Sequence, residues 1–187
     1  HESIAHMLEE IPKDLVHEII VVDGHSTDGT PELIRQLGYR VVSQEGAGYG
    51  MGVITGIKVA SGDLITFMDA DGSYDPEALS RMLLSIKDGH DMAFCSRYLP
   101  ESGSEDDTPI RLLGNKLLTF VVRSLFGVQL TDVLFFYALG KKEVFENLDL
   151  TSPDFSICIE IPVKVHRLGY KYTEIPSRER KRLYGKS

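Results

Sequence analysis

Short apolar runs alternate with amphipathic stretches through the first hundred residues of the chain. Runs rich in β-branched residues predict strands at 18–23, 40–43, 63–69 and 91–96. Apolar positions three and four residues apart predict helices at 30–37, from the glycine-rich segment 46–52 to residue 60, and at 76–87. Strands and helices alternate at this spacing when crossover helices join parallel strands. The pattern therefore predicts a mostly parallel α/β sheet flanked by helices.

The second half of the chain continues the alternation less regularly. It predicts helices at 110–126 and 155–168 and strands at 131–139 and 170–175. The stretch 99–108 is polar and acidic and contains Gly and Ser, so we expect a mobile surface loop that closes over a bound ligand. No internal repeat or linker interrupts the 187 residues, which predicts a single domain over 1–187.

Composition supports one folded core. Hydrophobic residues make up 42% of the chain and charged residues 26%, which excludes intrinsic disorder of the whole chain. No run approaches the roughly 20 apolar residues of a membrane-spanning helix, and the chain opens without the pattern of a signal peptide. Cys95 and Cys158 lie far apart in apolar surroundings, so we expect two buried, reduced thiols of a cytosolic protein.

Charge is distributed unevenly along the chain. The net charge of −8 argues against a nucleic-acid-binding protein, because such proteins neutralise phosphates with a basic face. Residues 164–187 nevertheless contain eight Lys and Arg against two Glu. A basic tail on an acidic body indicates a local anionic partner, such as a phosphate or a membrane surface.

Two carboxylates separated by one residue, Asp69 and Asp71, stand where an apolar strand runs out into a glycine-containing turn. This spacing allows both to converge on a hard divalent cation, and Mg²⁺ is commonly held by one or two carboxylates together with substrate phosphates. The alternative interpretation is that they form the turn and cap a helix, as we expect of Asp75. We favour the cation, because repelling carboxylates at a strand end are costly without a compensating charge.

The ends of other predicted strands carry polar residues too. Parallel sheets bind ligands at the carboxyl ends of their strands, and Asp23, Asp69 and Arg97 all fall there. Asp23 is followed by small hydroxyl residues, which suits the hydroxyl groups of a ribose or the edge of a base. The segment 46–52 (GAGYGMG) is not a P-loop, because no Gly-Lys-Ser/Thr follows it.

Four segments follow one another in a specific succession: IIVVDGHSTDGT, EGAGYGMG, GDLITFMDADGSYDP and FCSRYLP. This succession resembles the family 2 glycosyltransferases of the GT-A fold, which is Rossmann-like. Further matches at TPIRLLGN, LFGVQLTD and EIPSRERKRLYGKS extend the resemblance over nearly the whole chain, toward the dolichyl- and polyprenyl-phosphate sugar transferases. In that family a strand precedes the segment that begins here at Glu2, and relatives continue past Ser187. The resemblance implies a GT-A domain truncated at both ends, with its first strand missing.

The resemblance also implies a donor site. Asp23 is expected to contact the nucleoside of a UDP- or GDP-sugar, with Gly48 as a further donor-binding residue. Asp69 and Asp71 are expected to hold the sugar nucleotide together with Mg²⁺ or Mn²⁺. Ser73 stands where some relatives have a Gln that is a further metal ligand, and we include it in the expected metal site.

An acceptor site follows from the same comparison. Arg97, Arg111 and Arg182 match basic residues that grip the acceptor phosphate in the polyprenyl-phosphate enzymes, and Asn115 matches a polar position beside them. A phosphate acceptor is already an anion and needs no strong general base. A sugar hydroxyl would need one, for which Asp132 and Glu160 are the candidates.

The expected activity is transfer, with inversion, of a sugar from a nucleotide diphosphate sugar to a polyprenyl phosphate. Asp71, Arg97 and Asp132 are the predicted catalytic residues. We expect a cytoplasmic protein, compatible with peripheral contact at the cytoplasmic face of a membrane. Two alternatives stay open: a soluble transferase acting on a saccharide or small phosphorylated acceptor, and a sugar-nucleotide-binding module without turnover.

Overall fold

The computed structural model describes residues 2–182. Its helices are α1 (Glu2–Glu10), α2 (Thr30–Gln36), α3 (Tyr49–Val59), α4 (Ala78–Lys87), α5 (Pro109–Phe126), α6 (Lys142–Asn147) and α7 (Ile157–Arg167). Its strands are β1 (Ile20–Asp23), β2 (Arg40–Ser43), β3 (Leu64–Thr66), β4 (Met92–Ser96), β5 (Gly103–Ser104), β6 (Ala138–Lys141), β7 (Tyr172–Pro176) and β8 (Arg178–Glu179). The last five residues of the basic tail lie outside the described residues.

The strands of residues 2–182 pair in three sheets. β1 and β2 run parallel, and so do β5 and β8. The largest sheet has the order β3-β6-β4-β7, in which β4 and β7 are parallel and β6 runs antiparallel to both its neighbours. The predicted α/β sheet, with parallel pairs in the majority, is confirmed. The missing first strand stays a prediction, as does the extent of the single domain.

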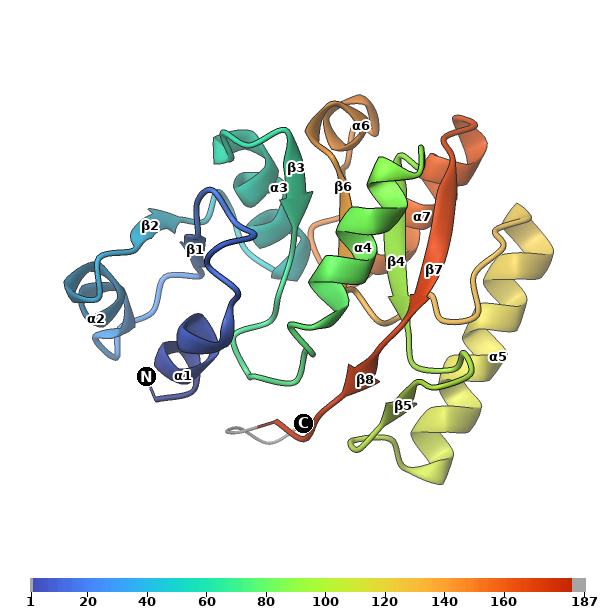
Figure 1. Ribbon diagram of the computed structural model, residues 1–187, viewed down its shortest axis with the longest axis horizontal. Coiled ribbons are helices and arrows are strands. Elements are labelled where there is room, and N and C mark those ends of the chain that lie inside the picture. Colours follow the sequence, from blue (N-terminus) through green and yellow to red (C-terminus); the bar gives the residue numbers. More distant parts are fainter. Residues whose placement is uncertain (1, 183–187) are drawn as a thin grey trace.

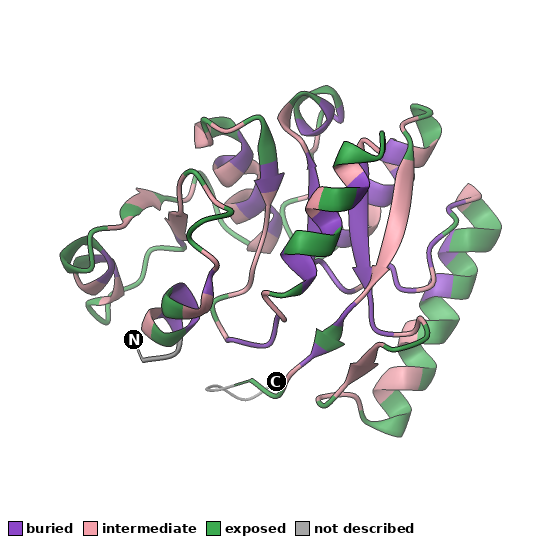
Figure 2. Cartoon of the chain, viewed as in Figure 1, coloured by how far each residue is buried: buried purple, intermediate pink, exposed green. Residues whose placement is uncertain are grey.

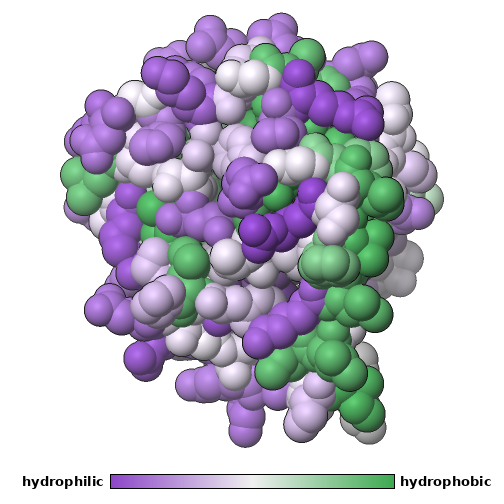
Figure 3. Space-filling model, turned by 90° about the vertical axis from the view of Figure 1, so that its right-hand side faces the viewer, coloured by the Kyte–Doolittle hydropathy of each residue, from purple (hydrophilic) through white to green (hydrophobic). Residues whose placement is uncertain are grey.

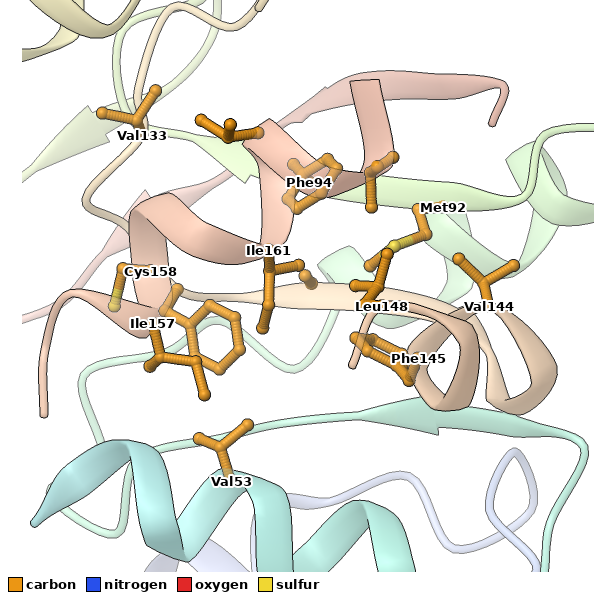
Figure 4. Close-up of a cluster of buried hydrophobic side chains, with 14 of the residues drawn as sticks. Val53, Met92, Phe94, Val133, Val144, Phe145, Leu148, Ile157, Cys158 and Ile161 are labelled. Atoms are coloured by element: carbon orange, nitrogen blue, oxygen red, sulfur yellow. The ribbon is translucent and has the colours of Figure 1, made fainter. Parts of the chain in front are cut away.

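Helices cover both faces of the largest sheet (Figure 1). Every residue of β4 is buried, and its side chains alternate between two hydrophobic clusters. Met92 and Phe94 join the cluster that contains Ile161 of α7 (Figure 4), whereas Ala93 and Cys95 join the one that contains Met82 of α4. Burial is concentrated around this central strand, while α5 at the edge keeps a largely exposed surface (Figure 2). Because β4 is fixed from both sides, the residues that follow it are held on a rigid element.

The segment before β1 contains a helix that we did not predict from the sequence. Ile4, Met7, Leu8 and Ile11 have the i, i+3, i+4, i+7 spacing of one helical face and pack around Ile34 of α2 in a separate buried cluster. The apolar pattern was present in the sequence, and we missed it. α1 thus covers the outer part of the fold, beside β1 and α2 (Figure 1).

The strand predicted at 131–139 was wrong for most of its length. β6 begins only at Ala138. The Asp132 carboxylate accepts the backbone N–H groups of Leu134 and Phe135, which bends the chain into a turn. Most residues before and after Asp132 are buried, so this part of the sequence is an apolar run that resembles the sequence of a buried strand. α6, directly after β6, was not predicted either.

The stretch 99–108, expected to be a mobile surface loop, contains a short strand, and its mobility and closure over a ligand stay predictions. Gly103 and Ser104 form β5, which pairs in parallel with β8, and the Ser104 hydroxyl hydrogen-bonds to Glu179. The same hydroxyl accepts the backbone N–H groups of Asp106 and Asp107. Polar contacts therefore anchor a segment that has little apolar surface. The other predicted helices and strands are present with ends shifted by a few residues.

Two expectations from composition can be compared with the structure. Cys95 and Cys158 are buried and form no disulfide, as predicted, and burial raises the pKa of each thiol to about 12. Within residues 2–182, no helix has both the length and the apolar character needed to cross a bilayer.

Candidate functional site

A cleft of about 470 Å³ lies where the chain leaves β3 and β4. The residues predicted from sequence that line it are Asp69, Asp71, Ser73, Arg97, Arg111, Asn115 and Arg182. They come from the turn after β3, the end of β4, the first two turns of α5 and the segment after β8. The structure therefore brings together in one cavity the paired carboxylates Asp69 and Asp71 and all three predicted cations, which lie far apart in the sequence.

Asp69 is held from both sides by tyrosine hydroxyls. Tyr49 donates to Oδ1 at 3.0 Å and Tyr74 to Oδ2 at 3.2 Å. Burial raises the pKa of Asp69, and the nearby charge of Asp71 raises it too, whereas the two tyrosine hydrogen bonds lower it. The hydroxyl of Tyr74 also lies 3.0 Å from the carbonyl oxygen of Phe136, so its single proton has two acceptors. Asp69 is thus held in one position by two hydroxyls, and its pKa is raised overall because burial outweighs the hydrogen bonds.

Asp71 is more open to the cleft. Its Oδ1 accepts the backbone N–H of Ser73 at 3.0 Å, which shapes the turn. Its Oδ2 lies 3.2 Å from Nε of Arg182, in the segment after β8. Arg180 donates its backbone N–H to the carbonyl oxygen of Ser73. These contacts hold the C-terminal segment against the turn that carries both aspartates.

Arg97 is the most deeply buried cation of the cleft. Its Nε and Nη2 donate to Oδ2 and Oδ1 of Asp132 at 2.7 and 3.1 Å, and its Nη1 donates to Glu179 at 3.0 Å. Burial lowers its pKa, but the hydrogen bonds and charges of Asp132 and Glu179 outweigh burial, so the pKa is raised. Arg97 therefore stays charged and lies in one fixed orientation.

The first turns of α5 supply the remaining polar wall. Arg111 donates to the Asp106 carboxylate at 2.8 Å, and Arg182 lies 3.7 Å from the same carboxylate. One helical turn later, Asn115 donates to the Tyr98 hydroxyl, which in turn donates to Asp107. Arg111 and Asn115 face the cleft together because residues four apart share one side of a helix.

The charge balance of the cleft fits a divalent cation. Carboxylates outnumber guanidinium groups among its lining residues, by five (Asp69, Asp71, Asp106, Asp107 and Glu179) to three (Arg97, Arg111 and Arg182). Oxygen donors and excess negative charge are what Mg²⁺ and Mn²⁺ prefer. Within residues 2–182 no group of three or more His, Cys, Asp or Glu converges as a ready-made metal site. That arrangement is compatible with a metal whose remaining ligands are phosphates and water.

Four residues singled out from the sequence lie outside the lining of this cleft. The Asp23 carboxylate accepts the backbone N–H groups of the two residues at 25 and 26. Asp132 does not reach the cavity and accepts hydrogen bonds from Arg97, which does. Glu160 accepts the backbone N–H groups of Thr151 and Ser152 and pairs with Lys164 at 2.7 Å, which ties the segment before α7 to that helix.

Gly48, the fourth of them, has a packing role in this structure. Its φ is +101°, and a Cβ there would collide with the backbone of Pro153. A residue with a side chain is thus excluded twice, by backbone conformation and by space. The glycine-rich segment therefore packs directly on the backbone before α7.

Sequence reasoning missed Tyr49, Tyr74 and Glu179. Both tyrosines lie inside quoted motifs, Tyr49 in the glycine-rich segment and Tyr74 just after the second aspartate. Their place inside these motifs was the available signal. Glu179 is 82 residues from Arg97, and only the pairing of β7 with β4 and of β8 with β5 brings them together.

Comparison with known proteins gives a family match. The family model described as glycosyl transferase family 2 matches residues 1–149. The chain is 28% identical to glycosyltransferase AglJ of Haloferax volcanii, over 94% of this chain and 58% of that protein. It is 31% identical to polyprenol monophosphomannose synthase of Mycolicibacterium smegmatis, over 84% of this chain and 64% of that protein. The chain thus spans about three fifths of the length of these two curated relatives.

A solved structure shares the architecture. Glucosyl-3-phosphoglycerate synthase from Mycobacterium tuberculosis, in complex with phosphoglyceric acid, superposes with a TM-score of 0.76 at 19% identity. The match covers 100% of this chain and 68% of that one. Another structure of that synthase holds Mn²⁺, uridine diphosphate and glucosyl-3-phosphoglycerate. This likeness confirms the GT-A architecture that the motifs implied.

Proposed function

Since this chain belongs to glycosyl transferase family 2, we propose that it transfers a sugar from a UDP- or GDP-sugar to a polyprenyl phosphate, with inversion at the anomeric carbon. The carrying observation is the cleft, in which Asp69 and Asp71 line the same cavity as the guanidinium groups of three arginines. A nucleotide diphosphate with its cation fits beside the two aspartates, and an anionic acceptor fits beside the guanidinium groups. The proposed reaction takes place at the cytoplasmic face of a membrane, where the two substrates meet.

The donor side is assigned to the turn after β3. Asp71 is the principal ligand for Mg²⁺ or Mn²⁺, with Asp69 and Ser73 as supporting groups. The bound cation would neutralise charge on the diphosphate that leaves. Tyr49 and Tyr74 orient the Asp69 carboxylate and favour its ionised form against the effect of burial. Asp23, at the end of β1, is proposed to meet the nucleoside. Gly48, which packs on the backbone of Pro153, is proposed as a further donor-binding residue.

The acceptor side is assigned to Arg97, Arg111, Asn115 and Arg182. In the transfer, a phosphate oxygen of the acceptor forms a bond to the anomeric carbon as that carbon's bond to the diphosphate oxygen breaks. The nucleotide diphosphate takes the electron pair. Arg111 and Arg182 are more exposed than Arg97, and they share the carboxylate of Asp106 in this structure. An incoming phosphate would compete with that carboxylate for both.

This assignment removes the need for a general base. The acceptor oxygen already carries negative charge, so the cations of the cleft have only to position it. The Asp132 carboxylate is taken up by Arg97 and by backbone N–H groups, which suits a positioning role. Glu160 is tied to the segment before α7. Neither carboxylate lines the cavity, and this favours a phosphate over a sugar hydroxyl as acceptor.

A transfer assay tests the proposal. The chain is incubated with Mn²⁺, a panel of labelled UDP- and GDP-sugars, and either a short polyprenyl phosphate, 3-phosphoglycerate or a saccharide. Label should enter the polyprenyl phosphate, and this transfer should be lost in Arg111→Ala and Arg182→Ala while donor affinity stays within about threefold. Exposed Arg35→Ala is the matched control. Transfer only to the soluble acceptors, or donor binding without transfer to any of them, overturns the proposal in favour of the two alternatives.

A further inference from the structure

α5 presents a large apolar surface to solvent. Seven of its aliphatic and aromatic side chains are between 36 and 85% exposed: Ile110, Leu113, Leu117, Leu118, Phe120, Val121 and Leu125. The edge of the molecule that carries α5 in Figure 1 is turned toward the viewer in Figure 3, where a band of hydrophobic surface runs down the right-hand side. Soluble proteins rarely leave a contiguous surface of this kind uncovered.

The apolar side chains form one continuous arc around the helix. Ile110, Leu113, Leu117 and Val121 follow each other at spacings of three and four residues, so they lie in a row along one side. The opposite side is the one that the protein buries. Val122 is buried there, and the Thr119 hydroxyl accepts the backbone N–H of Val133. The exposed arc is therefore a second apolar face, in addition to the one that holds α5 in the fold.

The charges of α5 are all of one sign. The helix contains Arg111, Lys116 and Arg123 and no Asp or Glu, in a chain whose net charge is −8. On a helical wheel these cations flank the apolar arc, with Arg111 on one side and Lys116 and Arg123 on the other. Lys116 and Arg123 also line a hollow of about 610 Å³ beside the ring of Phe120. An apolar face bordered by cations is the pattern of a helix that lies in the interface of an anionic bilayer.

We propose that α5 docks this chain onto the surface of a bilayer that contains anionic lipids, with the apolar arc inserted among the acyl chains and the three cations at the phosphate level. Charge selects this partner over a second copy of the chain. A twofold pairing of α5 with itself would bring the cations of two helices together without an acidic residue between them on either helix. A bilayer surface supplies the opposite charge and the apolar interior together.

The same helix connects this surface to the cleft. Arg111 and Asn115, in its first two turns, line the cavity, whereas the neighbouring Ile110 and Leu113 are exposed on the arc. A helix lying at the bilayer surface would therefore hold the acceptor side of the cleft next to the lipid phosphates. The functional role of the docking rests on the proposed function: a polyprenyl phosphate would reach Arg111 while its hydrocarbon chain stays in the membrane. The docking itself depends only on the surface of α5.

Vesicle sedimentation tests the docking without any transfer reaction. The 187-residue chain is mixed with vesicles of phosphatidylcholine alone or with phosphatidylglycerol, free of polyprenyl phosphate and of nucleotide sugar. Binding should require the anionic lipid and weaken with added salt. Replacing Leu113, Leu117 and Phe120 together by Ser should lower the vesicle affinity by about tenfold or more. Lys116→Glu with Arg123→Glu should lower it as well.

The matched control replaces Leu84 and Leu168, which are exposed on other helices or their ends, by Ser. This variant should bind vesicles within about twofold of the parent. Circular dichroism establishes that each variant is folded. Equal binding by the α5 variants and the parent overturns the proposal. So does an absence of binding to anionic vesicles, and so does a dimer in solution that the Leu113, Leu117 and Phe120 substitutions dissociate. Vesicle binding with no transfer to any acceptor would overturn the proposed function and leave the docking surface in place.

Discussion

Two hydrogen bonds join the guanidinium of Arg97 to the carboxylate of Asp132, at 2.7 and 3.1 Å. Arg97 follows the buried strand β4, and Asp132 lies in the turn before β6, so the pair fixes two loops against each other. Glu179 adds a second carboxylate to the same guanidinium. Because two carboxylates compensate its charge, Arg97 contributes less positive charge to the cleft than Arg111 and Arg182 do. Its main contribution is to hold the surrounding loops in place.

The first prediction concerns this pair. Asp132→Ala should lower the free energy of unfolding by about 3 to 5 kcal/mol, because it leaves a buried guanidinium with half its partners. Arg97→Ala should cost a similar amount, and the double variant should cost clearly less than the sum of the two. Urea denaturation of the four proteins measures this coupling, with the exposed Asp63→Ala as control. Additive costs would show that the two side chains do not depend on each other.

The second prediction concerns Asp71. Asp71→Ala should weaken donor binding in the presence of Mn²⁺ and make it insensitive to that ion. Each charge-assisted contact that is lost is expected to cost on the order of 1.5 to 3 kcal/mol. Titration calorimetry with UDP- and GDP-sugars, with and without Mn²⁺, checks the result, and Asp88→Ala at an exposed position serves as control. A variant that keeps the parent's response to Mn²⁺ would remove Asp71 from the metal site.

The third prediction concerns the tyrosine contacts of Asp69. Tyr74→Phe keeps the buried ring but removes a hydrogen bond that lowers the pKa of Asp69, so that pKa should rise further. Only the ionised carboxylate supports a cation, and the pH midpoint of Mn²⁺-dependent donor binding should therefore move upward. Tyr170→Phe, which removes a hydroxyl bonded to Asn147 far along the chain, should leave the midpoint unchanged. A midpoint that stays in place in Tyr74→Phe would separate Asp69 from metal binding.

The fourth prediction concerns acid stability. Burial raises the pKa of Glu160, but Lys164 and the backbone N–H groups of Thr151 and Ser152 outweigh it and lower the pKa to about 2. A depressed carboxyl pKa adds stability above the unfolded value and loses it as the pH falls toward the folded one. Glu160→Gln should therefore lower the free energy of unfolding near neutral pH by roughly 2 to 3 kcal/mol.

The difference between Glu160→Gln and the parent should shrink as the pH falls from about 4.5 to about 2. Denaturant unfolding at several pH values follows it, and Glu146→Gln, at an exposed position, is the matched control. A difference that is independent of pH would mean that packing, and not the charge of Glu160, stabilises the segment before α7.

The sequence predicted best where local pattern and chemistry coincide. Asp69, Asp71 and Arg97 could be placed at strand ends because an apolar strand has a clear pattern and its end follows from it. The turn around Asp132 could not be placed, because the residues after it form an almost continuous buried run. Such a run has no alternation of apolar and polar positions that would distinguish a turn from a strand. Its shape depends on one carboxylate that accepts neighbouring N–H groups, and composition gives no sign of that.

The hydrogen-bond partners of the site residues could not be predicted from local sequence for a different reason. Tyr49 and Asp69 are 20 residues apart, and Arg97 and Glu179 are 82 apart. Such pairs depend on which strands lie side by side, and a family resemblance carries the roles of residues without giving their hydrogen-bond partners. The pattern and the resemblance thus predicted seven of the 17 residues that line the cleft, whereas the contacts that hold them required the structure.

The pairing of β4 with β7 has a consequence for synthesis on the ribosome. Arg97 emerges 82 residues before Glu179, which at typical elongation rates is a delay of roughly 4 to 16 s. During that time β4 lacks its parallel neighbour, and its apolar edge is open to pairing with other nascent chains. The cleft is therefore among the last parts of this fold to be completed, and chaperones that shield strand edges should act while residues 97–179 are being translated.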